Sequence, residues 1–282
     1  IAARAAGRRD PRLVVVVLRG GLDGLAAVGP VGDPDYLRLH GEAALGRAGA
    51  EPAFDLDGFF ALNPAMPTLH GLFAARQATI VHAVATNYRE RSHFDGQDVL
   101  ESGQPGPGRV ESGWLNRAVA GRTAASPMRG LAVGATTPLV LRGPAPVLGW
   151  APQMLPPAGD ALAERVLSLY RHRDGELAEA LAAGLATDRM AAESGLSGDR
   201  AKSRGGMDAP GGMRQAAAGA ARLLAAPDGP RVAALTFEGW DTHAAEGVDA
   251  GNLYGRLGGL DAALGELRDG LGPAAWADTI VV

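Results

Sequence analysis

The most constraining feature of this 282-residue chain is a short run of apolar, mostly β-branched residues near its beginning. Residues 13–18 read LVVVVL, with no polar residue at alternate positions. A strand with one solvated face alternates apolar and polar residues, whereas a strand covered on both faces does not. The run therefore predicts a central strand in a parallel sheet with helices on both sides.

Further strands and helices alternate along the rest of the chain. The sequence predicts four more strands, at residues 78–85, 130–134, 231–237 and 279–282. Leucines recur at intervals of three and four from Leu253 to Leu271, which is the spacing of one helix face. This order favours a three-layer α/β/α sandwich with a mostly parallel sheet. We expect one domain over 1–282, with a flexible loop at 187–213 where the periodicity is lost.

Composition excludes several classes of function. The chain has no cysteine, so disulfides, thiol nucleophiles and iron–sulfur clusters are ruled out. Lys and Arg total 27 against 31 Asp and Glu, a net charge of −4, without the basic surplus of a nucleic-acid-binding protein. No apolar run approaches the roughly 18 residues of a membrane span. We therefore expect neither a nucleic-acid partner nor a membrane-spanning segment.

Polar residues follow three of the predicted strands. Asp23 lies in a glycine-rich turn after the first, Ser92 and His93 follow the second, and Asp241 and His243 follow the fourth. In open α/β sheets, ligands bind beyond the carboxyl ends of the strands. Because parallel strands end at the same edge, the sequence predicts a functional site there.

The segment Asp241–Thr242–His243 is the sharpest local signal for a metal. In an extended backbone, residues two apart project from the same face, so this carboxylate and imidazole can grip one divalent cation. A His–Asp hydrogen bond that orders a turn would produce the same pattern. With Asp23 converging on them, Asp241 and His243 become candidate metal ligands.

Ser92 precedes a helix expected at 93–102 and fits the pattern of an N-cap serine. A hydroxyl at a helix N-terminus is also well placed beside a bound phosphate or sulfate, and a metal could turn it into a nucleophile. His93 fits a metal ligand, a general acid or simply the first helical residue. Arg89 and Arg91 could clamp an oxyanion or belong to a solvated loop.

Several motifs occur in an order that resembles the DUF1501 family. They include GGLDG at 20–24, RSHFDGQD at 91–98 and GWDTH at 239–243, and the resemblance extends over about residues 13–282. That family is similar to the alkaline phosphatase-like, or sulfatase-like, superfamily. The resemblance implies a bimetal hydrolase site on an α/β/α sandwich. It also implies a domain that continues beyond Val282.

The resemblance further implies roles for individual residues. Asp23, Asp241 and His243 would bind a divalent metal ion (zinc, or magnesium, manganese or calcium), and Ser92 would be the nucleophile. The expected function is hydrolysis of a phosphate or sulfate ester of a small molecule or glycan. The alternative is a non-catalytic exported binding or cell-surface protein with the same fold. Many members resemble exported proteins with a twin-arginine leader, so we expect a periplasmic or secreted location, with the leader absent from this chain.

Overall fold

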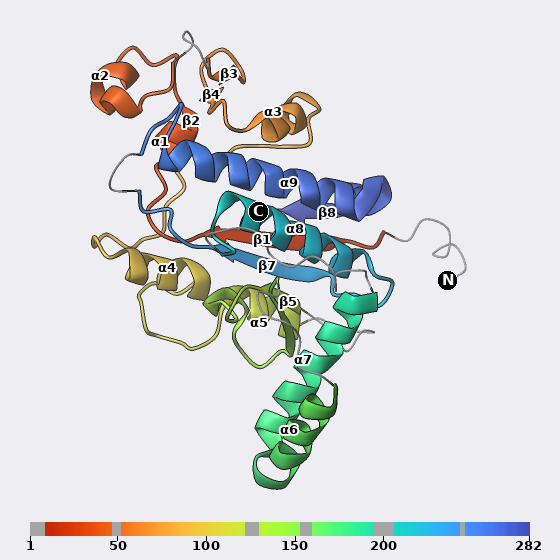
Figure 1. Cartoon of the computed structure of the whole chain (residues 1–282). Helices are drawn as coiled ribbons and strands as arrows, with labels where there is room; N and C mark the ends of the chain where they lie inside the picture. The colour runs from red at the N-terminus through yellow and green to blue at the C-terminus, as the bar shows by residue number, and fades with distance from the viewer. Residues whose placement is uncertain (1–8, 47–51, 122–129, 153–159, 194–205, 243–245) are drawn as a thin grey trace, which may run out of the picture.

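A five-stranded sheet, in which every neighbouring pair is parallel, lies at the centre of the protein (Figure 1). The computed structural model describes residues 9–46, 52–121, 130–152, 160–193, 206–242 and 246–282. The strand order is β6-β5-β7-β1-β8. The strands are β1 (Arg12–Leu18), β5 (Gly130–Val133), β6 (Val147–Trp150), β7 (Val232–Phe237) and β8 (Thr279–Val281).

Strand β1 is covered on both faces, as its apolar run predicts. Val14 packs into a core cluster with residues of α8 (Pro210–Ala225) and α9 (Asn252–Ala277). Val15 and Val17 pack into a second cluster on the other face. Successive side chains of a strand point to opposite faces, so the uninterrupted run supplies both cores at once.

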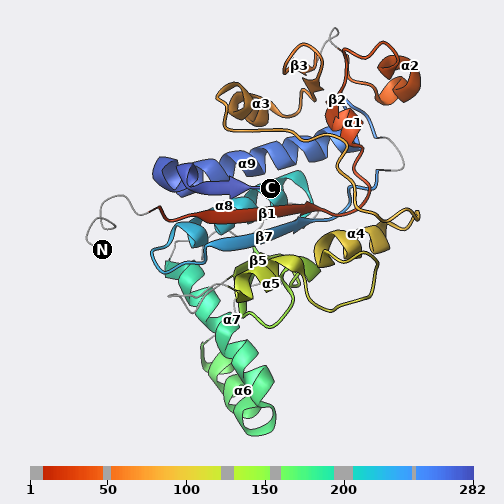
Figure 2. The same cartoon turned by 180° about the vertical axis from the view of Figure 1, so that it is seen from behind.

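The layers on the two faces differ in composition. Helices α8 and α9 cover one face, while α5 (Trp114–Ala120) and the 3₁₀ helix η3 (Leu139–Leu141) cover the other, with α4 (His93–Ser102) beside them (Figure 2). The leucine spacing expected of a helix is confirmed in α9, where Leu253 and Leu267 are buried. The central sheet flanked by helices confirms the expected α/β class.

A smaller antiparallel sheet and short helices lie outside α9 (Figure 1). These elements are α1 (Gly24–Ala27), β2 (Val28–Gly29), α2 (Tyr36–His40), η2 (Gly41–Ala43), β3 (Phe54–Asp55), β4 (Ala61–Leu62) and α3 (Pro67–Ala74). The buried carboxylate of Asp261 in α9 accepts hydrogen bonds from the backbone N–H groups of Thr68 and Leu69, at 3.0 and 2.8 Å. It satisfies two otherwise unpaired donors at the start of α3 and ties that helix to α9.

Helices α6 (Asp160–Arg173) and α7 (Gly175–Glu193) form a hairpin that projects from the body (Figures 1 and 2). The loop expected at 187–213 is therefore helical at both ends, since α7 runs to Glu193 and α8 begins at Pro210. Its middle, 194–205, lies outside the described residues. The end of α7 is rich in Ala, Met and Glu, which favour helix without any apolar stripe.

The prediction of a strand at 78–85 is wrong. These residues lie outside any helix or strand, and Val81 and Val84 are 72% and 75% exposed. Ala83 adopts a left-handed conformation (φ 56°), which breaks an extended backbone. Strand β6 was not expected from the sequence. No helix within the described ranges is long and apolar enough to cross a membrane.

The packing of α8 against the sheet generates a test of stability. A Cβ added at Gly219 would overlap the indole ring of Trp150, which is itself only 9% exposed. We expect Gly219→Ala to lower the free energy of unfolding by about 1–3 kcal/mol, because an overpacked core must shift. Urea unfolding followed by circular dichroism measures the change.

Gly255 in α9 is the matched control, because a Cβ there meets no atom within 4 Å. We expect Gly255→Ala to raise the free energy of unfolding by about 0.5–1 kcal/mol, since alanine favours helix over glycine. Equal effects of the two substitutions would contradict the close approach of α8 to Trp150.

Candidate functional site

The loops that follow β1 and β7 run side by side at the carboxyl edge of the sheet. The two strands pair in parallel up to Leu18 and Phe237. Beyond that point, the backbone N–H of Arg19 donates to the carbonyl of Phe237 at 2.8 Å, and that of Trp240 donates to the carbonyl of Arg19 at 3.2 Å. The ladder thus continues past the strands and holds the residues after each strand together.

Two glycines permit this close approach. Gly20 has φ 134°, and a Cβ there would lie 2.6 Å from the backbone nitrogen of Asp241. A Cβ on Gly21 would lie 2.6 Å from Cε1 of His93 and 3.3 Å from Oδ1 of Asp241. A larger residue at Gly20 would collide with the backbone after β7, and one at Gly21 would displace the imidazole of His93. The glycine-rich turn is therefore a steric requirement of the site.

His93 and Asp241 meet at this place. Nε2 of His93 lies 3.4 Å from Oδ1 of Asp241, and the two side chains are 47% and 34% exposed. One comes from the first residue of α4 and the other from the loop after β7. The structure therefore brings His93 and Asp241 together, although no strand precedes His93 at 78–85 as the sequence predicted, and it leaves both side chains reachable from solvent.

Ser92 is the N-cap of α4, as its sequence pattern predicts. Its Oγ accepts a hydrogen bond from the backbone N–H of Asp95 at 3.2 Å. The hydroxyl of Tyr88 donates to Oδ2 of Asp95 at 3.2 Å. Desolvation and this hydrogen bond both raise the pKa of Tyr88, so the phenol stays protonated at neutral pH. Ser92 thus lies beside His93 at a capped helix N-terminus.

Asp23 has a different set of partners from the one its position suggested. Its Oδ1 accepts from the backbone N–H groups of Leu25 and Ala26, at 3.0 and 3.1 Å, and so caps α1. Its Oδ2 lies 3.0 Å from Nε2 of His40 in α2. No local pattern in the sequence links Asp23 with His40. Both oxygens of Asp23 are therefore engaged within the region from α1 to α2.

Of the other predicted site residues, the structure describes Arg89 and Arg91 but not His243. Arg89 turns back on its own loop, where Nη1 donates to the carbonyls of Thr86 and Tyr88 at 2.6 and 2.9 Å. Arg91 is exposed. His243 lies outside the described residues. Within the part of the chain that is described, no group of three or more His, Asp or Glu side chains could hold a metal ion.

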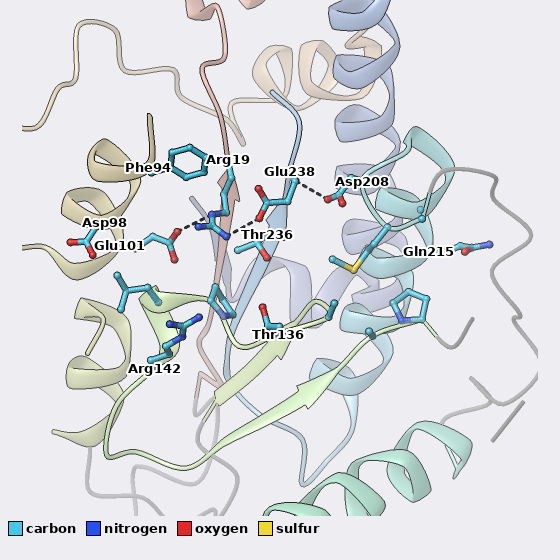
Figure 3. Close-up of a pocket in the computed structure, with 18 residues that line it drawn as sticks. Arg19, Phe94, Asp98, Glu101, Thr136, Arg142, Asp208, Gln215, Thr236 and Glu238 are labelled. Atoms are coloured by element: carbon cyan, nitrogen blue, oxygen red, sulfur yellow. Dashed lines mark hydrogen bonds and ion pairs between the residues drawn. The ribbon is translucent and has the colours of Figure 1, made fainter. Parts of the chain in front are cut away.

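A cavity of about 500 Å³ opens along the carboxyl edge of the sheet, as Figure 3 shows. It is bounded by the ends of β1, β5, β6 and β7, by α4 and by the start of α8. Phe94, next to His93, and Glu238, three residues before Asp241, both line it. Its wall combines apolar side chains, such as Leu139, with several charged ones.

Arg19 forms the centre of the charged wall (Figure 3). Its Nε lies 3.2 Å from Oε1 of Glu101 in α4, and its Nη1 lies 2.7 Å from Oε1 of Glu238. Glu101 is only 1% exposed, and its Oε2 accepts from the backbone N–H of Val140 at 3.0 Å. The guanidinium thus links α4 to the ends of β1 and β7.

Sequence reasoning missed this linkage. Arg19 and Glu238 each follow a strand directly, so the rule that singled out Asp23 could have found them. Glu101 carries no such signal, because a glutamate in a polar helix ordinarily faces solvent.

A parallel sheet with helices on both faces defines an α/β protein, and the cavity beyond the carboxyl ends of its strands is its candidate ligand site. The chain matches the family described as "Protein of unknown function (DUF1501)" over residues 10–282, and it belongs to that family. The search of curated proteins found no match. The search of solved structures found none either.

The buried end of the Arg19 linkage generates a second prediction. Glu101→Ala removes the buried partner of Arg19 and leaves the N–H of Val140 without its acceptor. We expect the free energy of unfolding to fall by about 2–3 kcal/mol. Glu238→Ala is the control, because its side chain is 54% exposed and such pairs contribute at most about 1 kcal/mol. Similar losses of stability in both variants would contradict the larger contribution of the buried Arg19–Glu101 contact.

Proposed function

We propose that this protein is a metal-dependent hydrolase of phosphate or sulfate esters that works at the carboxyl edge of its sheet. The observation that carries the proposal is the 3.4 Å contact between Nε2 of His93 and Oδ1 of Asp241. The proposed substrate is an ester of a small molecule or glycan. A periplasmic or secreted location is proposed with it, and rests on the family resemblance alone.

The donor chemistry and spacing of this pair fit a divalent cation. An imidazole nitrogen and a carboxylate oxygen are both ligands of Zn²⁺, at about 2.0–2.2 Å. Two ligand atoms on one tetrahedral ion at that range are separated by about 3.4 Å. His93 and Asp241 would hold the ion, with His243 as the proposed third ligand. When bound, the metal would act as a Lewis acid and lower the pKa of a nearby hydroxyl.

The rest of the proposed chemistry falls to the start of α4. Ser92 would supply the attacking hydroxyl, and the N-terminus of the ten-residue α4 would favour the negative charge of the ester. Arg19 is already engaged by Glu101 and Glu238, so anion binding would not depend on it. The cavity beside Phe94 is large enough for the organic part of the ester. In this proposal, Asp23 positions α1 and α2 instead of binding the metal.

A second candidate function is a binding protein without turnover. It is favoured by the engagement of Ser92 Oγ and of both Asp23 oxygens in helix caps and the His40 contact. Such a protein would use the same edge and cavity to hold a ligand. The two candidates differ in whether the hydroxyl of Ser92 reacts.

The metal site is tested by changing its two proposed ligands. We expect His93→Ala and Asp241→Asn each to lower kcat/KM for p-nitrophenyl phosphate or sulfate by at least a hundredfold, since even the loss of an outer partner of a metal ligand costs about 10–100-fold. The matched control is His172→Ala, which removes an exposed imidazole on the α6–α7 hairpin. Unchanged zinc binding by calorimetry in both site variants would contradict the proposal.

The role of Ser92 is tested with an asparagine. Asparagine caps a helix about as well as serine, so Ser92→Asn removes the hydroxyl and keeps the start of α4 in place. We expect hydrolysis to be lost while the melting temperature and zinc affinity stay at wild-type values. Retained hydrolysis in this variant would exclude Ser92 as the nucleophile, and a wild-type protein that binds zinc without any hydrolysis would favour the binding protein.

A further inference from the structure

One part of the cavity wall, between α8 and β7, consists of groups that accept hydrogen bonds. Asp208 precedes α8 and Gln215 lies within it, while Thr236 belongs to β7 and Glu238 follows that strand (Figure 3). Thr236 and Glu238 are two residues apart, so both reach the cavity from the same side of the chain. We call these four residues the polar end of the cavity.

Two groups of the polar end lack hydrogen-bond partners although they are removed from solvent. Thr236 is only 8% exposed, and its hydroxyl makes no hydrogen bond to the described residues. Oε1 of Gln215 is buried and likewise has no partner among them. Buried polar groups in folded proteins are nearly always hydrogen-bonded, because leaving them unpaired costs free energy. Both groups line the cavity, so a ligand in it could complete them.

The charges of the cavity wall indicate the sign of that ligand. The wall contains four carboxylates and two guanidinium groups, which belong to Asp98, Glu101, Asp208, Glu238, Arg19 and Arg142. Arg19 is already shared by Glu101 and Glu238, and Arg142 is exposed, with its Nε donating to the carbonyl of Thr137. A cleft lined by an excess of one charge concentrates ligands of the opposite charge. The wall therefore favours a cation.

Asp208 is held in place without an ion pair among the described residues. Its Oδ1 accepts a hydrogen bond from the backbone N–H of Glu238 at 2.7 Å. Nη1 of Arg256 donates to the backbone carbonyls of Asp208 and Glu238, at 3.3 and 2.9 Å, and Arg256 does not line the cavity. Oδ2 of Asp208 accepts no hydrogen bond from the described residues. The backbone is thus fixed on both sides of the polar end, and one carboxylate oxygen is left for a ligand.

We propose that the cavity binds an organic ammonium ion, with its charged group at the polar end and its apolar part along Leu139 and Met207. A primary ammonium has three N–H donors and no acceptor. It matches Oδ2 of Asp208, Oε1 of Gln215 and the hydroxyl oxygen of Thr236, all of which accept. As a statement about the substrate, this inference rests on the proposed function and adds that the organic part of the ester carries an amine.

Three probes of similar shape and different charge test the wild-type protein. Benzylamine is a cation at neutral pH, benzyl alcohol is neutral and benzoate is an anion. We expect ligand-observed NMR titrations at low salt to give a dissociation constant of about 1 mM for benzylamine, in the range of a fragment-sized ligand. Binding of benzyl alcohol should be weaker by about tenfold or more, because charge-assisted hydrogen bonds are the stronger ones, and benzoate should not bind.

Asp208→Asn tests the charge at the polar end. Asparagine keeps an oxygen that can accept the N–H of Glu238 but removes the negative charge, so benzylamine should bind about tenfold more weakly while benzyl alcohol is unaffected. The matched control is Asp228→Asn, which makes the same change at an exposed residue beyond the other end of α8. It should leave all three titrations unchanged.

Thr236→Val separates ligand binding from packing. Valine keeps the branched shape of threonine and removes a hydroxyl that has no partner among the described residues. We expect the affinity for benzylamine to fall severalfold while the melting temperature stays the same or rises, since no hydrogen bond between described residues is lost. A hydroxyl with a purely structural role would instead lower the melting temperature and leave the affinity unchanged.

All titrations contain EDTA and no ester, so their outcome does not depend on a metal ion or on hydrolysis. A failure of the ammonium proposal would therefore leave the metal site standing, and the reverse also holds. No measurable binding of benzylamine, equal affinity for benzylamine and benzyl alcohol, or an Asp208→Asn variant that keeps the wild-type preference would overturn the proposal.

Discussion

The parallel pairing of β1 with β7 is the contact on which the rest of the structure depends. Six consecutive residue pairs, from Leu13 with Val232 to Leu18 with Phe237, bring both strands to the same end point. Two core clusters form on the two faces of this ladder, which helices then cover. The loops that leave it continue to hydrogen-bond, so the polar residues after the strands have no freedom to separate.

The second constraint is how α4 reaches that edge. Arg19, directly after β1, contacts the buried Glu101 near the end of α4, while His93 at the helix start meets Asp241. A helix held at both ends has a defined direction, which sets where its N-terminus and Ser92 point. The same charged linkage forms one wall of the cavity, so positioning of the helix and the shape of the cavity are coupled.

Much of the fold could be predicted from the sequence, because continuous apolar runs and leucine spacing report burial directly. The prediction of a strand from the apolar run at 78–85 was wrong, because hydrophobic periodicity carries no information on the left-handed backbone of Ala83. For the site, the strand-end rule led to Asp241 after β7, whereas it reached His93 through a strand at 78–85 that the structure does not contain. It could not show that Asp23 turns toward His40, because that contact depends on the path of the chain through α1 and α2.

The proposal that His93 and Asp241 hold a metal ion is tested most directly by a crystal structure of the zinc-saturated protein, with diffraction collected at the zinc absorption edge. We expect an anomalous peak within about 2.0–2.2 Å of Nε2 of His93 and of a carboxylate oxygen of Asp241. An anomalous map with zinc bound elsewhere, or with no peak between these two side chains, would contradict the metal site and the hydrolase proposal built on it.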